Sequence, residues 1–278
     1  MLSRLASGDA GWLLVALFWG SLLSLAVAEI WRPLHAGRPE PKGRIPGNIA
    51  LGLINAGIAL LLPVSTVFSA EWAAQHGVGL LNQTAPPLLL AIPATVAVRS
   101  LATYVIHRLS HRLPWLWRIH RVHHADTALD LSTGFRNHPL ELLVVAPWLA
   151  LATVTFGLDP VTLLAYETAA VVFSLWDHAN VRLPDRADRT LRAALITPAM
   201  HHVHHSAVPA ETDSNYGDVF SLWDRLFGTY RGLDDEALAA MRIGLGDDFD
   251  PGASSLAQQL KLPLVARPRG NAAAVSEA

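Results

Sequence analysis

Residues 104–124 read YVIHRLSHRLPWLWRIHRVHH and hold five of the chain's histidines. His107 and His111 are four residues apart, and His120 is followed at three and four residues by His123 and His124. In an α-helix these spacings place side chains on one face. The stretch therefore predicts two helical faces, each covered with imidazole rings.

A third histidine face is predicted further along the chain, where His201-His-Val-His-His205 repeats the same five-residue pattern. In this repeat, His201, His204 and His205 share one face of a helix. A single histidine is usually an ordinary surface residue, but a pattern that occurs twice beside an i, i+4 pair is not explained in that way. Of the five remaining histidines, we assign the ordinary surface role to His35, His76 and His202.

The number of histidines indicates two metal ions. Imidazole binds zinc, copper, iron and nickel, and a single tetrahedral zinc takes at most four ligands. The eight histidines of the three faces exceed that limit. The pattern also lacks the glutamate of the His-Glu-X-X-His helix of zinc proteases, which disfavours peptide hydrolysis.

Two isolated histidines are further candidates for metal ligands. His178 lies in the sequence Trp-Asp-His-Ala-Asn, and His138 lies in Arg-Asn-His-Pro-Leu-Glu. We predict a ligand role for both, with hydrogen bonding to a ligand as the competing role of His138.

Carboxylates near the histidines are expected to support the site. Neutral imidazoles leave the bound metals strongly cationic, and Glu141, Asp177 or Asp213 could offset that charge and orient rings through their free N–H groups. The alternative for each is an acid that simply faces solvent.

The rest of the chain indicates a membrane protein. Hydrophobic residues make up 51% of its 278 residues and charged residues 16%, against about 25% charged in an average soluble domain. Gly11–Ile30 is apolar for long enough to cross a bilayer and is interpreted as a retained helix, not a signal peptide. The other predicted spans are Asn48–Phe68, Leu88–Val98 continuing as a helix to His107, Leu140–Phe156 and Val161–Trp176. One such helix could be buried in a soluble protein, but several disfavour that reading.

Charges in the loops predict the orientation in the membrane. The stretches 31–47 and 99–121 contain several Lys or Arg residues, whereas 70–85 and 157–160 contain none. Positive charge favours the cytoplasmic side. The alternating loops therefore place every histidine cluster at the cytoplasmic face of a multi-pass integral membrane protein.

The last third of the chain has a different character. Charges are frequent after Asn180, and residues 181–260 are predicted to form a cytoplasmic helical cap, followed by a disordered tail from about Ala266. The net charge of −2 excludes a basic field for nucleic acid. Cysteine is absent, which excludes disulfides, iron–sulfur clusters and thiolate metal sites.

The three histidine boxes, interleaved with apolar spans, resemble the fatty acid hydroxylase / sterol desaturase superfamily. The resemblance covers residues 92–232 and divides the chain into N-terminal transmembrane helices (1–91), a histidine-box domain (92–232) and a C-terminal cytosolic segment (233–278). Further matching words are Tyr104, Leu116-Trp-Arg-Ile-His120, Arg136-Asn-His-Pro-Leu-Glu141, His178-Ala-Asn180, Thr197-Pro-Ala-Met-His201, Asn215-Tyr-Gly217 and Trp223-Asp-Arg-Leu-Phe-Gly-Thr-Tyr230.

The resemblance implies an all-α integral membrane fold with four to five transmembrane helices and a cytosolic helical cap that carries a histidine-rich di-metal site. It implies two iron ions, which zinc could replace in vitro, and activation of O2. The implied ligands are His107, His111, His120, His123, His124, His201, His204 and His205, to which our own candidates His178 and His138 are added. We expect Asn215 and Glu141 to act at the site.

One position departs from the family pattern. Members often have an acidic residue seven positions before the first histidine of the first box, and here that position is Ser100. We expect such a carboxylate to orient a ligand histidine, and Ser100 cannot supply one.

The implied reaction is oxidation of a C–H bond in a lipid, sterol-like or isoprenoid substrate, with hydroxylation favoured over desaturation on family breadth alone. Because no glycine-rich nucleotide fingerprint is present, we expect a separate electron-transfer protein. An alternative is a histidine-rich metal-binding membrane protein, a transporter or sensor, without redox chemistry. Histidines at the ends of spans, not midway along them, disfavour transport. A family member with only a structural role is disfavoured because all eight box histidines are present.

Overall fold

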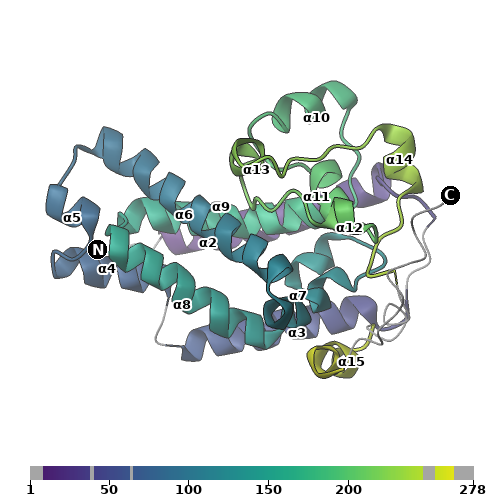
Figure 1. Cartoon of the computed structure of the whole chain (residues 1–278), viewed down its shortest axis with the longest axis horizontal. Coiled ribbons are helices and arrows are strands. Elements are labelled where there is room, and N and C mark those ends of the chain that lie inside the picture. Colours follow the sequence, from purple (N-terminus) through teal and green to yellow (C-terminus); the bar gives the residue numbers. More distant parts are fainter. Residues whose placement is uncertain (1–8, 38–40, 63–64, 247–253, 266–278) are drawn as a thin grey trace.

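The computed structural model describes residues 9–37, 41–62, 65–246 and 254–265, and its regular elements in these ranges are all helices. Long helices run along the longest axis of the molecule, and most of the short helices gather at the end opposite α4 and α5 (Figure 1). The predicted disordered tail from Ala266 lies outside the described residues.

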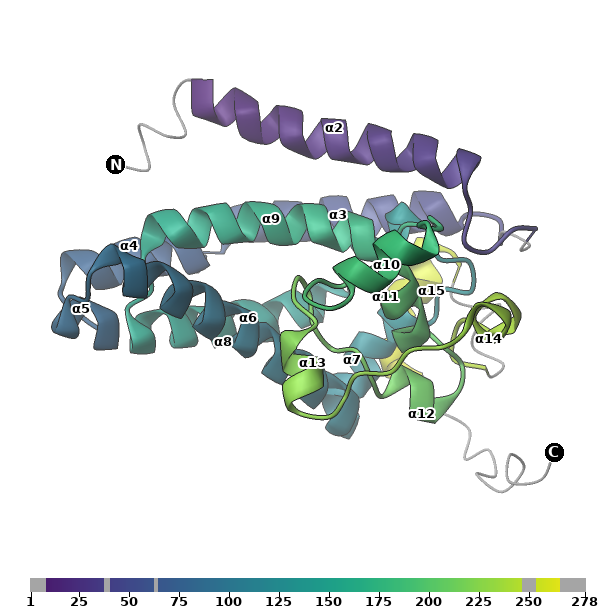
Figure 2. The ribbon, with the colours of Figure 1, turned by 90° about the horizontal axis from the view of Figure 1, so that it is seen from above.

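The long helices confirm the predicted all-α membrane fold. Four helical stretches are long and apolar enough to cross a membrane, namely Gly11–Trp31, Arg44–Thr84, Leu88–Arg112 and Pro139–Phe156. The fifth predicted span is helical but is not one of these four. The long helices are α2 (Asp9–Trp31), α3 (Arg44–Leu61), α6 (Leu88–Arg112), α8 (Pro139–Phe156) and α9 (Pro160–His178). In the view of Figure 2, α2 lies beside α9 at the edge of the molecule.

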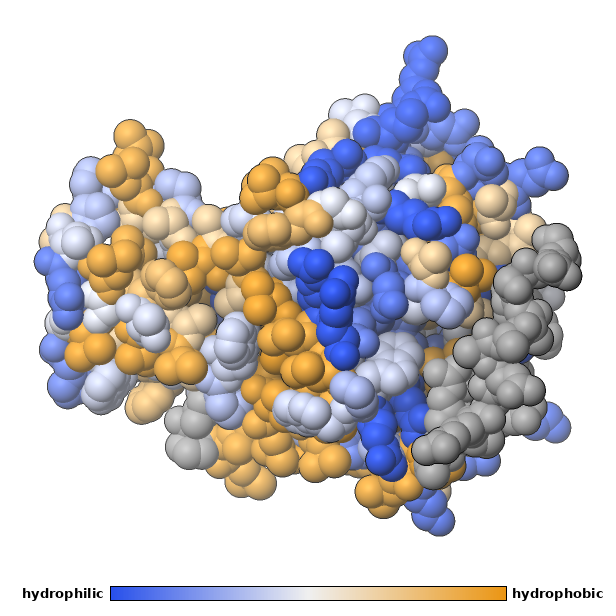
Figure 3. Space-filling view, in the orientation of Figure 1, coloured by the Kyte–Doolittle hydropathy of each residue, from blue (hydrophilic) through white to orange (hydrophobic). Residues whose placement is uncertain are grey.

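The surface agrees with a lipid environment around the long helices. Hydrophobic residues dominate the part of the surface in Figure 3 that the long helices form, and hydrophilic residues gather over the short helices. Leu60, Leu89 and Trp12 are 87%, 84% and 76% exposed. Large apolar side chains exposed together in this way mark a surface that water does not cover.

The predicted span Asn48–Phe68 lies within the candidate span Arg44–Thr84, but the structure divides it between two helices. Helix α3 ends at Leu61, and a new helix, α4 (Thr66–Gln75), begins after Ser65. The Ser65 hydroxyl accepts a hydrogen bond from the Phe68 N–H at 3.1 Å, so it caps the new helix. Hydropathy does not register such a cap, because the residues on both sides of it are apolar. A short helix, α5 (Leu80–Thr84), follows.

Two loops that the charge pattern placed on the same side of the membrane touch each other. A Cβ atom added to Gly79 would lie 2.3 Å from the backbone nitrogen of Gly157, so only glycine permits this approach. Gly79 precedes α5, and Gly157 ends α8 in a left-handed conformation. This contact is at the opposite end of the long helices from the histidine clusters (Figure 1).

Arg99, which we counted among the loop charges, lies inside α6 and is buried. Its Nε and Nη2 each lie 2.8 Å from a carboxylate oxygen of Glu167 in α9. The hydroxyl of Thr66 in α4 donates to the same carboxylate at 2.7 Å. A charge inside an apolar helix layer requires such partners, so the pair joins three helices.

The region 181–260 contains short helices in its described part, as the predicted cap requires. These helices are α10 (Asp185–Leu191), α11 (Pro198–His204), α12 (Pro209–Thr212), α13 (Leu222–Leu226), α14 (Asp235–Ala240) and α15 (Leu256–Lys261). Three other short elements lie outside this region, namely α7 (Pro114–His124), η1 (Leu131–Phe135) and η3 (Leu262–Leu264).

Apolar clusters fix the two short helices that carry histidines. Val122 of α7 packs with Leu51 of α3 and Leu262 of η3. Val203 of α11 packs with a second cluster that includes Leu238 and Ile243. Each histidine helix therefore has an apolar side held in a core and a histidine side turned away from it.

Candidate metal centre

Each of the three histidine clusters lies on a helix, as its spacing predicted. His107 and His111 occupy the last turns of α6. Helix α7 begins at Pro114, directly after Leu113, which is both the C-cap of α6 and the N-cap of α7. Leu113 is extended, and the residue before a proline avoids the helical conformation. The chain therefore turns sharply there, and the histidine face of α7 is brought onto that of α6. Helix α11 carries the third cluster, with His205 at its C-cap.

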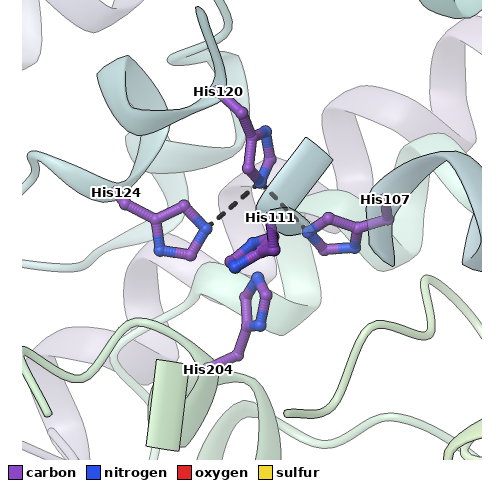
Figure 4. A group of neighbouring side chains, drawn as sticks. All are labelled: His107, His111, His120, His124 and His204. Atoms are coloured by element: carbon purple, nitrogen blue, oxygen red, sulfur yellow. Dashed lines mark hydrogen bonds between the residues drawn. The ribbon is translucent and has the colours of Figure 1, made fainter. Parts of the chain in front are cut away.

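The rings converge in two groups. Within each group, the candidate ligand nitrogens lie within 4.8 Å of one another. The first histidine group consists of His107, His111, His120, His124 and His204 (Figure 4). The second histidine group consists of His123, His178, His201 and His205.

Each five-residue box contributes to both groups. In α7, His120 and His124 belong to the first group and His123 to the second; in α11 the assignment is reversed. Adjacent helical residues point about 100° apart, so the doubled histidine at the end of each box serves two neighbouring sites. The two groups are in contact, because the rings of His124 and His205 stack with centroids 4.6 Å apart.

Hydrogen bonds set the protonation of several rings in the first group. The Nδ1 atom of His107 lies 2.9 Å from the Tyr216 carbonyl oxygen. The Nδ1 atom of His204 lies 2.6 Å from the Ser214 carbonyl oxygen. A carbonyl oxygen only accepts, so each Nδ1 carries the hydrogen and each neutral ring has a lone pair on Nε2. The Nδ1 atom of His120 lies 2.7 Å from a Glu141 carboxylate oxygen, which favours the same tautomer.

These lone pairs point toward one another. The Nε2 atoms of His107 and His120 are 3.1 Å apart, and those of His120 and His124 are 3.2 Å apart (Figure 4). The Nε2 atom of His204 is buried and has no hydrogen-bond partner. Facing lone pairs repel unless a cation lies among them. The donor set therefore fits a metal ion better than it fits a hydrogen-bond network.

The second group repeats this arrangement around His178. Its Nδ1 donates to the Ser174 carbonyl at 2.7 Å, so its Nε2 carries the lone pair. That Nε2 lies 3.0 Å from the Nε2 atoms of both His123 and His201. The Nε2 of His205 lies 3.3 Å from that of His201. Four imidazole nitrogens thus converge, as a metal site of neutral nitrogen ligands requires.

Burial keeps the rings neutral. Removal from water lowers the pKa of His123, His124, His201 and His205 well below the usual value, with neighbouring histidines adding to the effect. Burial lowers the pKa of His204 to about 3. Metal ligands must be deprotonated, and these rings meet that condition at neutral pH.

Two of the three carboxylates considered from the sequence contact a ring. Glu141 faces His120, as described above, and Asp213 places a carboxylate oxygen 3.2 Å from Nδ1 of His111. Asp177 precedes His178 in the sequence and is buried, but it makes no hydrogen bond to a ring among the described residues. The first group therefore has two carboxylate neighbours.

His138 is the candidate ligand that the structure does not bring to either group. It is the N-cap of α8, where its Nδ1 accepts a hydrogen bond from the Leu140 N–H at 3.1 Å. Its Nε2 lies 3.2 Å from the Leu260 carbonyl oxygen. Both ring nitrogens are occupied by backbone groups, which explains its distance from the metal ligands.

Asn215 does not reach a histidine ring either. Its side-chain amide donates to the carbonyls of Met200 and Arg231 and accepts from the Arg231 N–H. It is buried in a left-handed backbone conformation with φ 52°. It therefore ties α11 to the chain near residue 231, and acts on the site through the position of that helix.

Ser100, which stands where an acid was expected from the family resemblance, does not contact a histidine ring. Its hydroxyl accepts from the Trp223 indole N–H at 3.0 Å and donates to the Val96 carbonyl at 2.7 Å, so it binds α13 and not a ring. His107 is oriented instead by the Tyr216 carbonyl. Asp224 accepts hydrogen bonds from the backbone N–H groups of Tyr216 and Gly217 and so holds that carbonyl in place.

Sequence reasoning missed these orienting groups. The carbonyls of Ser174, Ser214 and Tyr216 leave no sequence signal, because every residue has a carbonyl. The only available signal for Asp224 was its place in the Trp223-Asp-Arg stretch that carried the family resemblance.

The surface assignment of His35 and His202 was wrong. Both side chains are buried, and their rings stack with centroids 5.2 Å apart. The Nε2 of His202 lies 3.2 Å from the carbonyl oxygen of His178. They belong to neither histidine group but pack behind the second. His76 is exposed, as expected.

A buried polar network holds the end of α7. Arg136 donates to the Val122 carbonyl at 2.7 Å and to Asn48 at 3.1 Å. Asp126 accepts from Arg44 at 3.0 Å and from Asn48 at 3.1 Å. These bonds fix the last turn of the second box against the start of α3.

Comparisons with known proteins agree with this geometry. The family model described as fatty acid hydroxylase matches residues 92–229. The chain is 27% identical to the ornithine lipid hydroxylase of Rhizobium tropici, over 74% of this chain and 63% of the relative. It is 28% identical to the alkylglycerol monooxygenase of Danio rerio, over 51% of this chain and 31% of the relative.

A third relative is the cholesterol 25-hydroxylase-like protein of Danio rerio, which is 33% identical over 45% of this chain and 49% of the relative. In each case the match spans less than two thirds of the relative's length. No solved structure matches the chain.

Proposed function

This chain belongs to the fatty acid hydroxylase family, and from that premise we propose that it is a membrane oxygenase that uses two iron ions and O2 to hydroxylate a C–H bond of a lipid. The observation that carries the proposal is the pair of adjacent histidine groups whose ring nitrogens converge. Names of relatives with lipid hydroxylase or monooxygenase activity support it.

The first histidine group would hold one ion and the second the other. Five and four imidazoles are available, respectively. Iron, when bound, supplies the oxidant from O2 that can break a strong C–H bond. The chain itself keeps the rings neutral and oriented, through burial and through the hydrogen bonds of Glu141, Ser174 and Tyr216.

A cavity of about 190 Å³ is lined by residues of both groups, and there a substrate would meet them. His107 and His120 of the first group and His178 of the second are among its lining residues. Apolar side chains, Ile106 of α6 and Val145 of α8, form another part of the wall. An alkyl segment fits such a wall and would displace water from the reacting carbon.

Orientation follows from the charges at this end of the long helices. Arg108, Arg112, Arg118 and Arg121 all lie close in sequence to the first two boxes, and positive charge favours the cytoplasmic side. We propose that the histidine groups lie at the cytoplasmic edge of the bilayer. A lipid would then enter from the membrane, and a separate cytoplasmic protein would supply electrons.

The test compares lipids extracted from cells that express the wild-type chain, His120→Ala or His76→Ala. The wild type and His76→Ala, which alters an exposed histidine outside both groups, are expected to produce lipids that have gained one oxygen atom, labelled when 18O2 is supplied. His120→Ala is expected to produce none. A loss of two hydrogens instead of a gain of oxygen would assign desaturation. Full activity in His120→Ala would refute the metal role.

A further inference from the structure

One short helix beside the long helices exposes apolar side chains to its surroundings. Helix α13 carries Leu222 and Leu226, which are 56% and 65% exposed, and Phe227 directly after the helix is 46% exposed. Leu222 and Leu226 are four residues apart, so they lie on one face of the helix. Figure 3 shows hydrophobic surface at the place where Figure 1 shows α13. Large apolar side chains exposed together mark an interaction surface.

Contacts with α6 show how far α13 extends along the long helices. The indole N–H of Trp223 donates to the hydroxyl of Ser100 at 3.0 Å, and Ser100 lies midway along α6. Ser100 precedes His107 by seven residues, or about 10 Å along a helix axis. The ring of Phe227 stacks on that of Tyr104, also in α6, with centroids 5.3 Å apart. Helix α13 therefore lies beside a candidate membrane span and not beyond its end (Figures 1 and 2).

Contacts with a second long helix lead independently to the same conclusion. The hydroxyl of Tyr166 in α9 donates to Oδ1 of Asp218 at 3.1 Å, and the Tyr166 ring lies 6.4 Å from that of Phe220. Tyr166 precedes His178, the last residue of α9, by twelve residues, or about 18 Å along the helix axis. Residues 216–229, the re-entrant segment, therefore extend from the histidine groups toward the middle of two long helices.

The backbone of the re-entrant segment is suited to a hydrocarbon environment. Non-helical backbone at membrane depth is tolerated only where the protein satisfies its polar groups. The Asp224 carboxylate accepts hydrogen bonds from the N–H groups of Tyr216 and Gly217 at 2.7 and 2.9 Å. The Asp224 carbonyl accepts from the Thr229 N–H at 2.7 Å. These polar groups thus find their partners within the segment, while α13 presents an apolar face to its surroundings.

The basic residue of α13 directs its charge toward the rest of the protein. The Nη2 atom of Arg225 donates to the Arg192 carbonyl at 2.6 Å. The Arg225 guanidinium also lies over the Tyr230 ring, 4.0 Å from its centroid. Arginine side chains near a membrane edge turn their charged groups away from the hydrocarbon in this way. The charge of Arg225 is therefore compatible with apolar neighbours that face lipid.

We propose that the re-entrant segment dips into the bilayer leaflet nearer the histidine groups, where Leu222, Leu226 and Phe227 contact acyl chains. The partner of this surface is lipid, because α13 is attached to α6 within a candidate membrane span. The proposal concerns the membrane contact alone and requires neither iron nor oxidation. It also means that the Tyr216 carbonyl, which orients His107, belongs to a segment held in the membrane.

Spin labelling of the full chain in phosphatidylcholine nanodiscs tests the depth of α13. The chain has no cysteine, so each cysteine variant carries one label. In Leu226→Cys, power saturation compares collisions of the label with O2, which partitions into hydrocarbon, and with an aqueous nickel chelate. Leu53→Cys, at a 70% exposed position midway along α3, is the hydrocarbon control. Glu236→Cys, at an exposed position of α14, is the aqueous control.

The apolar face of an interfacial helix is buried about 5–10 Å into the boundary between headgroups and acyl chains. The O2-to-nickel ratio of Leu226→Cys should therefore approach that of Leu53→Cys and exceed that of Glu236→Cys several-fold. Leu222→Cys, one turn earlier on the same face, should give the same result.

Two results would overturn the proposal. The first is a ratio in both α13 variants equal to that of Glu236→Cys, which would place the helix in water. The second is a label shielded from both reagents, which would show that protein, such as a second copy of the chain, covers α13. Because the measurement needs no turnover, its outcome is independent of the test for lipid oxidation.

Discussion

The two histidine groups use the same ligand type but differ in what surrounds their rings. The first has five histidines, and two of them contact carboxylates, Glu141 and Asp213. The second has four buried histidines, and His178 is held by a backbone carbonyl. Among the described residues, no carboxylate is hydrogen-bonded to a ring of the second group.

The two groups therefore differ in how far the protein compensates the charge of a bound ion. A carboxylate behind an imidazole makes the ring more basic and offsets the charge of a bound ion, whereas a carbonyl orients the ring with less compensation. We therefore expect the first group to bind its ion more tightly and the second to leave its ion more electron-poor. Asp177, which precedes His178 in the sequence, makes no hydrogen bond to a ring among the described residues.

The largest effect on lipid oxidation should come from replacing either of the two adjacent histidines that end the second box. His123→Ala and His124→Ala change neighbouring residues, but the first removes a ligand of the second group and the second removes a ligand of the first group. Each should lower lipid oxidation by more than about 100-fold, beyond the usual effect of altering groups behind the ligands. Iron per chain should fall by about one ion in each variant.

Mössbauer spectra of the two variants should differ, because different ions remain. Identical spectra with the same iron content would show that the histidines do not form two separate sites. His76→Ala is the matched control and should leave both iron and spectrum unchanged.

Acid should destabilise the metal-free chain by several kcal/mol. In the unfolded chain histidine has a pKa of about 6.5, whereas burial lowers the folded pKa of His204 to about 3 and lowers those of His123, His124, His201 and His205. Below pH 6.5 the unfolded state therefore binds protons that the folded state does not. Stability is present above that pH and is lost as the pH falls toward the folded values, by up to about 1.4 kcal/mol per pH unit for each ring.

The measurement is urea unfolding of the metal-free protein in detergent between pH 7.5 and 5. The unfolding free energy should decline below pH 6.5, with a shallower slope in His124→Phe. A free energy that stays constant down to pH 5 would contradict the assignment of these rings as buried and neutral.

Glu141→Gln tests the carboxylate of the first group without changing its size. Loss of the charge behind His120 should weaken binding of one of the two ions by about 10–100-fold. The other ion should be retained at the wild-type affinity. Metal titration against a chelator measures both affinities, and equal weakening of the two would contradict the separation of the groups.

Asp213→Asn should have the smallest effect. Its carboxylate is 58% exposed and 3.2 Å from His111, so water screens the interaction. The affinity of the first site should change by less than about threefold. A loss as large as that of Glu141→Gln would indicate that the Asp213 carboxylate is shielded from water in the metal-bound protein.

Much of the site could be predicted because it follows from periodicity. The spacing of His120, His123 and His124 was enough to place them on one helix end, and the count of histidines was enough to suggest two metals. The break at Ser65 and the burial of Arg99 were not predictable in the same way. The break depends on a local capping hydrogen bond, and the burial of Arg99 depends on its partner Glu167 in a distant helix. A hydropathy profile reports neither contact.

The sequence by itself determined which histidines share a helix and which segments are apolar enough to lie in a membrane, because both depend only on the order of residues along one helix. Only the tertiary structure decided that His123 and His124 serve different groups and that His138 serves none. The reason is that helical geometry sets the angle between neighbouring side chains, whereas the partner that each ring meets depends on how α6, α7, α9 and α11 pack.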